Sequence, residues 1–354
     1  MKYLIVQEWN STKGNHAGMH HMCDLLIAKY PDKYRMIVKD CPPQKKQYKN
    51  KIVRKLLHRW VDYKYRKAYE KDYLRICQSM FEQLHEGDEV FLLEYNWPAT
   101  SQYGLAKHIK SNYPGVKVYA LSHITPTFFH KLGMESTIRK WDKVTDRQLT
   151  LGSSLSAYFG SIGIDKQKIS TGFHYVDNEY YKIDAPQPVH DKVTIITMGS
   201  LQRDYDMLAQ IVKRCPNVNW IICRGRKNVD DLFAGTPNVT LKGYLAEDEL
   251  RHEMAISDLS LNVLEDTVGS NVITTSMAIG LGIITSNVGS IHDYCDDTNA
   301  VFCKNETSSF VNAINGLCQN RQVVNQMKNS SFDKSRQLAI ENVDQWFNSL
   351  RQEE

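Results

Sequence analysis

The sequence predicts an α/β protein with two Rossmann-like domains, each a parallel sheet flanked by helices, and a ligand cleft between them. The length of 354 residues is ample for two separate cores. Short apolar runs alternate with helical stretches, which is the pattern of parallel sheets. This pattern restarts after a polar segment that contains two prolines. We therefore expect an N-terminal domain over 1–181, a linker over 182–191, a C-terminal domain over 192–335 and a final helix within 336–354.

The composition is that of a soluble protein that folds throughout. Charged residues make up 24% of the chain and hydrophobic residues 42%, without the long biased tracts of a disordered protein. No apolar run approaches the roughly 20 residues of a membrane span, and the run at 3–6 is too short for a signal peptide. The eight cysteines are scattered without a CxxC pair, so we expect buried thiols rather than a zinc site. The sequence thus predicts a cytoplasmic protein.

The first domain opens with a strand at 3–6, a loop that contains Gly14 and Asn15, and a helix over about 18–29. Further strands are expected at 89–93, 116–121, 148–151 and 169–171, with a helix near 103–111. His123 follows one of these strands directly. Rossmann-like domains bind ligands beyond the carboxyl ends of their strands, so His123 is a candidate site residue.

A basic segment interrupts this order between residues 45 and 75. Residues 1–180 hold 28 Lys and Arg against 18 Asp and Glu, whereas 181–354 hold 16 against 22, and much of the positive excess lies in this segment. Apolar residues recur at four-residue steps through Trp60, which predicts a basic amphipathic helix. One interpretation is attachment to an anionic membrane surface or a phosphate-bearing acceptor; the other is a solvated helix that packs on its own domain. The flanking cations and the interfacial aromatic residue are Lys51, Arg54, Lys55, Arg59 and Trp60. Nucleic acid is not an expected partner, because no binding motif accompanies the charge.

The second domain repeats the βα order and carries cationic loops. Strands are expected at 193–198, 219–223, 239–241 and 259–264. The loops after the first three contain Gly199, Ser200 and Arg203, then Arg224, then Tyr244. The loops of a doubly wound domain gather at one edge of its sheet. A diphosphate would satisfy this combination of donors.

The most informative stretch, 258–290, reads as strand, glycine-containing loop, helix, glycine and strand. Gly269, Ser270 and Asn271 offer unhindered backbone N–H groups at the start of a helix over about 272–279, where an anion is stabilised. The helix is expected to end at Gly280. Glycine spacing alone is a weak signal, and an ordinary β/α repeat whose glycines only make turns remains the alternative.

These motifs resemble the two-domain GT-B glycosyltransferases, and among them the retaining family 4. The resemblance spans nearly the whole chain. Its most specific part covers 267–272, 280–284 and the turn at 288–291; the loop at 199–205 and the segment at 171–177 agree in order and spacing. The final helix is similar to the one that crosses back onto the first domain in that fold, although it could equally cap the second domain.

The resemblance implies a nucleotide-sugar donor on the second domain, a glycan or lipid-linked acceptor on the first, and no metal or other cofactor. Arg203 would contact the diphosphate as a catalytic residue, with Gly199, Ser200 and Arg224 nearby. The residues Gly269, Ser270 and Asn271 would supply hydrogen-bond donors, and Tyr244 would lie near the nucleobase. His123 would orient the donor sugar, and Gly14 and Asn15 would touch the diphosphate or the acceptor. Retention in this fold is explained by front-face attack, in which the donor's own phosphate takes the acceptor proton.

One departure from the family pattern is Thr275, which stands where the family has a glutamate that binds hydroxyls of the donor. Thr275 is still expected to bind the donor, because its hydroxyl can donate or accept one hydrogen bond, but a threonine cannot give the charged, two-oxygen acceptor that suits a diol. The expected function is a hexosyltransferase of cell-surface polysaccharide or glycolipid assembly, peripheral on the cytoplasmic membrane face. Two alternatives remain open: a catalytically silent GT-B-like partner of another glycosyltransferase, which Thr275 favours, and a sugar-nucleotide epimerase, for which the sequence shows no recognisable acid/base motif.

Overall fold

The structure, a computed structural model, describes residues 1–9, 14–40, 51–97, 102–183, 190 and 192–351, with backbone alone for 51–59 and 62. It divides into two compact units, residues 1–172 and 173–354. The contacts place 173–181 with the second unit, whereas the sequence pattern put this segment in the first domain. The reason is local: the Val176 N–H donates to the Leu338 carbonyl, and Tyr181 is buried in the second core. Most of the predicted linker lies outside the described residues.

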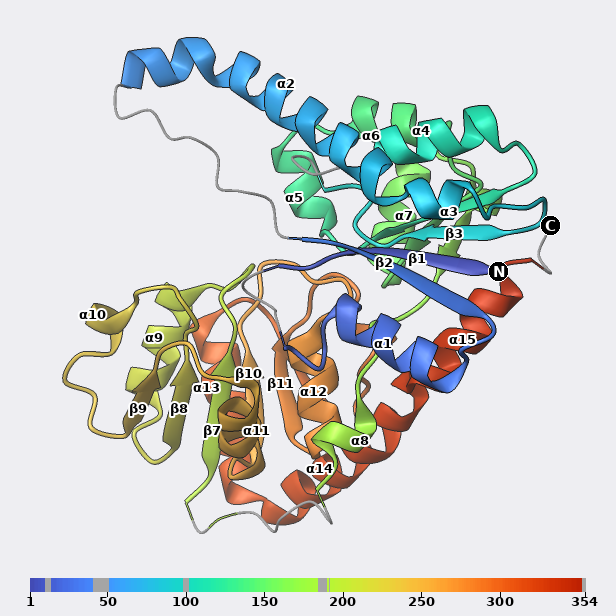
Figure 1. Cartoon of the computed structure of the whole chain (residues 1–354). Coiled ribbons are helices and arrows are strands. Elements are labelled where there is room, and N and C mark those ends of the chain that lie inside the picture. The colour runs from blue at the N-terminus through green and yellow to red at the C-terminus, as the bar shows by residue number, and fades with distance from the viewer. Residues whose placement is uncertain (10–13, 41–50, 98–101, 184–189, 191, 352–354) are drawn as a thin grey trace. The chain divides into compact units, whose positions relative to one another are not determined.

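The first unit is built on a parallel sheet of six strands in the order β2-β1-β3-β4-β5-β6 (Figure 1). All of its strand pairs are parallel. The strands are β1 (Lys2–Gln7), β2 (Tyr34–Lys39), β3 (Glu89–Leu92), β4 (Lys117–Ser122), β5 (Arg147–Thr150) and β6 (Ile169–Thr171).

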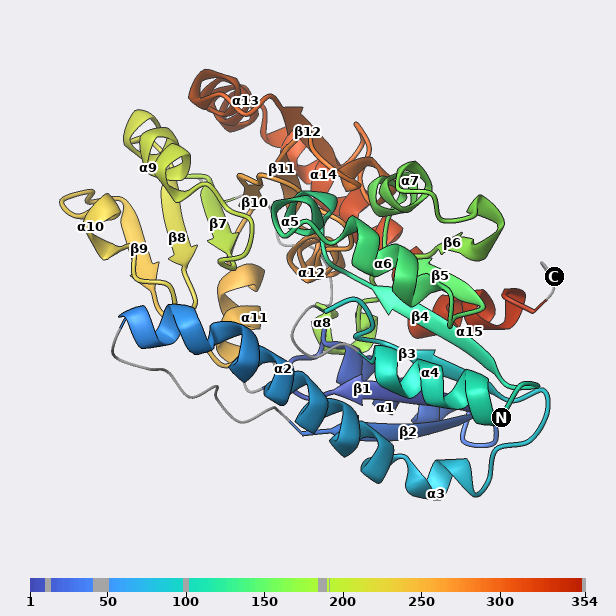
Figure 2. The same cartoon turned by 90° about the horizontal axis from the view of Figure 1, so that it is seen from above.

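Helices cover both faces of this sheet. Figures 1 and 2 show α1 on one face and α2 and α4 on the other. The helices are α1 (Met19–Lys29), α2 (Lys51–Ile76), α3 (Gln78–Phe81), α4 (Tyr103–Asn112), α5 (Pro126–Lys131), α6 (Glu135–Asp142) and α7 (Ser153–Ser161). The strand order reverses direction between β1 and β3, and such a switch point is where open α/β sheets bind ligands.

The second unit has its own six-stranded parallel sheet, in the order β12-β11-β10-β7-β8-β9. The first strand of this unit, β7, therefore lies beside the fourth, β10, and the switch point falls between them. The strands are β7 (Thr194–Met198), β8 (Asn219–Cys223), β9 (Val239–Lys242), β10 (Leu259–Asn262), β11 (Gly282–Ser286) and β12 (Ala300–Cys303).

Two apolar cores, one on each face, hold the second sheet between layers of helices. Successive residues of β7 alternate between them, with Ile195 in one core and Ile196 in the other. Helices α9 and α13 contribute to the first core, and α8, α11 and α12 to the second. The helices are α8 (Asn178–Tyr181), α9 (Tyr205–Arg214), α10 (Asp230–Phe233), α11 (Glu247–Ala255), α12 (Asn271–Ile279), α13 (Thr307–Gln319), α14 (Arg321–Ser335) and α15 (Ile340–Ser349).

This architecture confirms the predicted pair of Rossmann-like sheets, and α12 ends as expected at Gly280, which adopts a left-handed conformation. The structure contains two strands that the sequence pattern did not predict, β2 and β12. Sequence patterning missed β2, because its residues YRMIVK mix charged and apolar side chains at the edge of the sheet. Contacts group α15 with the second unit, and its predicted crossing to the first remains a prediction.

Two expectations from composition concern membrane spans and thiols. Among the described residues, no helix has the length and apolar character that crossing a membrane requires. Seven cysteines fall within the described part of the chain, and all are free thiols; six of them are buried. Cys41 lies outside the described residues.

Candidate functional site

The switch point of the second sheet places Arg203 between two loops. The segment after β7 pairs with the segment after β10 through an antiparallel bridge between Arg203 and Leu264. The bridge is flanked by two backbone hydrogen bonds, from Asp204 N–H to Val263 O at 3.2 Å and from Glu265 N–H to Gln202 O at 2.9 Å. The backbone therefore fixes where the Arg203 side chain begins.

The Arg203 guanidinium is a buried cation that donates a hydrogen bond to a neutral side chain. The residue is 9% exposed, and its Nη2 donates to Asn262 Oδ1 at 3.0 Å. Its Nη1 is buried and has no hydrogen-bond partner within the described residues. Burial lowers the pKa of Arg203 to about 10, because the charged form loses hydration. Such a group favours an anionic ligand.

Gly199 allows the close approach on which this arrangement depends. Its φ is +81°, and its carbonyl accepts a hydrogen bond from the Tyr205 hydroxyl at 2.7 Å. A Cβ at this position would lie 3.4 Å from both Arg203 Nε and Val272 Cγ2. The β7 loop, the arginine and the first turn of α12 thus meet at one place. The next residue, Ser200, is partly exposed to solvent.

The start of α12 offers the backbone donors that the sequence predicted. Ser270 is the N-cap residue, but its side chain makes no capping hydrogen bond, and the first turn contains no acidic residue. Gly269, Ser270 and Asn271 are partly exposed. The positive end of the helix dipole is therefore uncompensated beside Arg203. The structure brings together Gly199, Arg203 and the 269–271 turn, as expected for an anion site.

Thr275 lies one turn further along α12 and uses its hydroxyl within the helix. Its Oγ1 donates to the Asn271 carbonyl at 2.7 Å, and the residue is buried. Oxygen lone pairs remain on the hydroxyl, but the proton is engaged. The residue therefore has less capacity to bind a ligand hydroxyl than the glutamate that the family pattern has there.

The next two loops at this sheet edge form a separate group of contacts. Arg224 Nε lies 2.7 Å from Asp230 Oδ1, and its Nη1 donates to the Lys227 carbonyl at 2.9 Å. The Arg224 side chain therefore makes its contacts within its own loop. Tyr244 is exposed, and the Arg226 guanidinium lies 5.0 Å from the centre of its ring.

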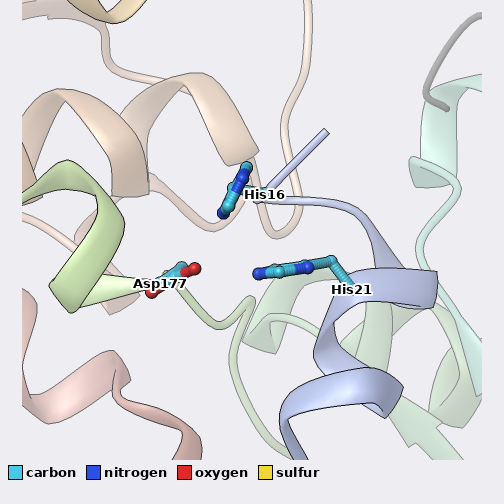
Figure 3. Close-up of side chains that lie close together, drawn as sticks. All are labelled: His16, His21 and Asp177. Atoms are coloured by element: carbon cyan, nitrogen blue, oxygen red, sulfur yellow. The ribbon is translucent and has the colours of Figure 1, made fainter. Parts of the chain in front are cut away.

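In the first unit, Gly14 and Asn15 form the turn that leads into α1. Gly14 has a φ of +77°, and Asn15 Oδ1 accepts from the Ala17 N–H at 2.7 Å. Figure 3 shows the neighbouring rings of His16 and His21, whose centroids are 4.2 Å apart. Asp177, drawn in the same view, belongs to the second unit, where its carboxylate accepts from the Tyr180 N–H.

His123 stands one residue beyond β4, as predicted, and has a partner that sequence reasoning did not assign. Its Nε2 lies 3.3 Å from Glu94 Oε2. Glu94 follows β3 by two residues, and β3 pairs with β4. The signal in the sequence was a carboxylate directly after a buried strand.

The basic segment forms α2 as expected, and the structure describes only some of its cationic side chains. The side chains of Lys51, Arg54, Lys55 and Arg59 lie outside the described residues, as does the run 45–50. Trp60 is 52% exposed, and Lys64 Nζ lies 3.8 Å from its ring centre. An aromatic side chain and a cation therefore share the outer surface of this helix.

Comparison with known proteins supports the resemblance on both fold and domain. Residues 192–320 match the family described as glycosyl transferases group 1. No curated protein sequence matches the chain. Among solved structures, HepE from Anabaena in complex with UDP is 14% identical, with 99% of each chain covered and a TM-score of 0.70. Sucrose-phosphate synthase from Thermosynechococcus elongatus is 10% identical over 100% of both chains, with a TM-score of 0.69. A glycosyltransferase from Rickettsia africae is 13% identical over 99% of this chain and 98% of its own, with a TM-score of 0.65.

The second unit therefore carries a glycosyl transferases group 1 domain, and the chain has the GT-B fold. The predicted resemblance is confirmed at this level. Identities of this size establish the fold, and the substrates have to be argued from the site.

Proposed function

We propose that this chain is a retaining, metal-independent glycosyltransferase that moves a hexose-type unit from a nucleotide-sugar to a glycan or lipid-linked acceptor. The reaction would serve cell-surface polysaccharide or glycolipid assembly. One observation carries the proposal: the buried guanidinium of Arg203 has an unpaired Nη1 and lies beside the uncapped start of α12. The guanidinium carries a positive charge and the helix N-terminus a partial positive charge. Both lie at the switch point of the second sheet. A diphosphate supplies the charge that both lack.

Leaving-group stabilisation is the chemistry that these groups support. Negative charge grows on the diphosphate as the bond from the sugar breaks, and prearranged donors stabilise that charge most in a site shielded from water. Arg203 and the N–H groups of 269–271 would act in this way. A positive side chain and a helix N-terminus together can then stabilise the leaving diphosphate, as a metal ion does in other transferases.

The neighbouring residues have subsidiary roles in the proposal. The exposed ring of Tyr244, already stacked by Arg226, is the candidate for the nucleobase. HepE has been solved with UDP and with UDP-glucose, so uridine nucleotides are the first donors to test. The first unit would take the acceptor, with His123 directed at the sugar and Gly14 and Asn15 at the same substrates.

Attachment of α2 to an anionic membrane surface is a further part of the proposal, supported by the exposed Trp60 and its Lys64 partner. Binding to vesicles that contain phosphatidylserine should weaken between low and physiological salt, because surface charges are screened. Trp60→Ala should reduce the binding, and Trp346→Ala is the tryptophan control from the second unit. Equal binding of neutral and anionic vesicles, or none at low salt, would remove this part.

One observation favours a second function, a catalytically silent partner of another glycosyltransferase. Thr275 replaces a carboxylate that binds the donor, and its proton is bound to the Asn271 carbonyl. A partner protein would keep the fold without binding a nucleotide-sugar.

The test is thermal stabilisation of the purified chain by UDP, GDP, dTDP, ADP, CMP and their common sugar conjugates. A ligand that binds only the native state raises its stability, by about 2.7 kcal/mol at 100 times Kd. We expect one nucleotide class to raise Tm selectively and its sugar conjugate to support transfer. No shift with any member of the panel would contradict the enzyme proposal and leave the silent partner.

A further inference from the structure

A row of polar side chains crosses the apolar core between the second sheet and α12. Ser260 pairs with Ile196 on β7 and with Ile283 on β11, and both isoleucines belong to the core that α12 helps to form. Asn262 lies two residues further along β10, so its side chain is on the same face of the sheet. Ser260, Asn262 and Ser276 of α12 are each fully buried. Apolar residues would pack this layer at lower cost, since buried polar groups depend on complete hydrogen bonding.

The three side chains form a hydrogen-bonded row that ends at Arg203. Ser276 Oγ donates to Ser260 Oγ at 3.0 Å, and Asn262 Nδ2 donates to the same oxygen at 3.0 Å. The other end of the amide, Asn262 Oδ1, accepts from Arg203 Nη2 at 3.0 Å. A guanidinium has donors only, so Asn262 must turn its oxygen to Arg203 and its nitrogen to Ser260. The row therefore holds both the amide and the guanidinium in one orientation.

The acceptor that meets this guanidinium is uncharged. Burial lowers the pKa of Arg203 to about 10, because the charged form loses hydration. An amide oxygen accepts a hydrogen bond without neutralising the cation, whereas an aspartate, which has nearly the same shape, would form an ion pair with it. Arg203 Nη1 has no hydrogen-bond partner within the described residues. The network thus orients the guanidinium and leaves its charge and one donor group for a ligand.

We propose that Asn262 is the positioning residue of Arg203, and that its amide keeps the guanidinium oriented and without a counter-charge until the donor diphosphate binds. This inference rests on the proposed glycosyltransferase function, and all of its residues belong to the second unit. A buried charge without a charged partner costs the unliganded protein free energy, and a bound diphosphate removes that cost. The missing counter-charge that destabilises the unliganded protein therefore strengthens donor binding.

The change Asn262→Asp separates orientation from charge. The new carboxylate would keep an oxygen at the place where Asn262 Oδ1 accepts from Arg203. Its second oxygen would replace Nδ2 and accept from the Ser260 hydroxyl, since a hydroxyl both donates and accepts. The hydrogen-bonded row therefore survives with one bond reversed, and the charge beside Arg203 is what changes.

Calorimetry measures the binding of UDP, or of the nucleoside diphosphate that the thermal panel selects, to the full-length wild type, Asn262→Asp and Asn299→Asp. We expect Asn262→Asp to raise the Tm of the unliganded protein and to weaken nucleotide binding about tenfold or more, because its charge neutralises Arg203 and repels the diphosphate. Asn299 is the matched control: it is fully buried, its Nδ2 donates to Ser331 Oγ at 3.3 Å, and its Oδ1 accepts from the Asp296 N–H at 3.0 Å. Asn299→Asp also buries a new carboxylate, yet it should bind the nucleotide as the wild type does.

A double-mutant cycle tests whether Asn262 acts through Arg203. Asn262→Ala should lower kcat about tenfold or more in the otherwise wild-type chain, since it removes a hydrogen bond to a charged group. In an Arg203→Met background the same change should lower kcat no further. Asn299→Ala should change kcat in neither background. If Asn262→Asp does not fold, as judged by circular dichroism, this cycle alone decides.

The outcomes separate this inference from the proposed function. A wild type that binds neither UDP nor another nucleotide of the panel would remove both. Three results would overturn the positioning role and leave the transferase standing: wild-type nucleotide affinity in Asn262→Asp, equal losses of affinity in Asn262→Asp and Asn299→Asp, or additive losses of kcat in the cycle.

Discussion

The two sheets reverse their strand order at different places in the chain, and the two switch points carry opposite chemistry. In the second unit, Arg203 brings a buried positive charge whose partner is the neutral Asn262. In the first unit, Glu94 and His123 bring buried groups that gain or lose a proton. Both points leave polar atoms unsatisfied within the described residues. The same architecture therefore presents a buried cation at one switch point and a buried carboxyl group beside an imidazole at the other, and side chains rather than topology set this difference.

The largest expected effect follows from removing the charge at the second switch point. Arg203→Met should lower donor turnover about 100-fold, since loss of one preorganised donor to a developing anion costs about 10² to 10³ in kcat. The same change should leave the unliganded protein as stable or make it more stable, because a buried charge without a charged partner is costly. Steady-state kinetics and urea unfolding measure the two effects.

Arg214→Met, at an exposed position in the same unit, is the control and should alter neither quantity. A strongly destabilised Arg203→Met that still transfers sugar would show a structural arginine instead.

The second prediction concerns the stability of the first unit against pH. The folded-state pKa of Glu94, about 8, lies above its usual value of 4.5. Between these values the folded state keeps a proton that the unfolded state has lost, so stability falls as pH rises through this window. Relative to Glu94→Gln, the wild type should lose more than about 1.4 kcal/mol of unfolding free energy between pH 5 and pH 8, the equivalent of one pKa unit.

Urea denaturation at several pH values measures this difference. Burial lowers the pKa of His123 in the wild type, and its contribution below pH 6.5 should largely cancel in the comparison with the variant. A wild type and variant that run parallel across the range would mean that Glu94 is ionised as readily in the folded state as in the unfolded one.

A smaller effect distinguishes backbone strain from contact with Arg203. Gly199→Ala and Gly235→Ala both place a side chain at a positive φ, which costs about 1 to 2 kcal/mol. Only at Gly199 does the added Cβ meet neighbours, Arg203 and Val272, whereas nothing lies within 4 Å of the one at Gly235. We expect similar losses of Tm in both variants but weaker UDP binding in Gly199→Ala alone. If both variants bound UDP equally well, Gly199 would have no role in the anion site.

The smallest effect is expected at Thr275. Its hydroxyl bonds within α12, and Thr275→Val should change stability by less than about 1 kcal/mol, since such back-bonds contribute little to helices. Donor affinity should also stay within twofold of the wild type. A clear loss of donor affinity, measured by calorimetry, would instead give the hydroxyl a role in binding.

Sequence reasoning reached the second switch point better than the first. The glycine at 199, the arginine at 203 and the turn at 269–271 are local signals, because turns and helix starts depend on neighbouring residues. Their meeting also follows from the rule that loops of a parallel sheet gather at one edge. What the sequence did not show was the burial of Arg203, or that Arg224 is engaged by Asp230 in its own loop.

The Glu94–His123 pair was not assigned as a unit for a different reason. The two residues follow separate strands, and their contact depends on the register between β3 and β4. Register across a long connection is not readable from one sequence. The strand β2 was missed because tertiary pairing at the sheet edge, not its own periodicity, specifies it.

A crystal structure of the chain with UDP tests the central claim most directly. The account predicts that oxygens of the diphosphate accept hydrogen bonds from Arg203 Nη1 and from backbone N–H groups of residues 269–271. A diphosphate bound elsewhere, with Arg203 Nη1 still unpaired, would contradict it.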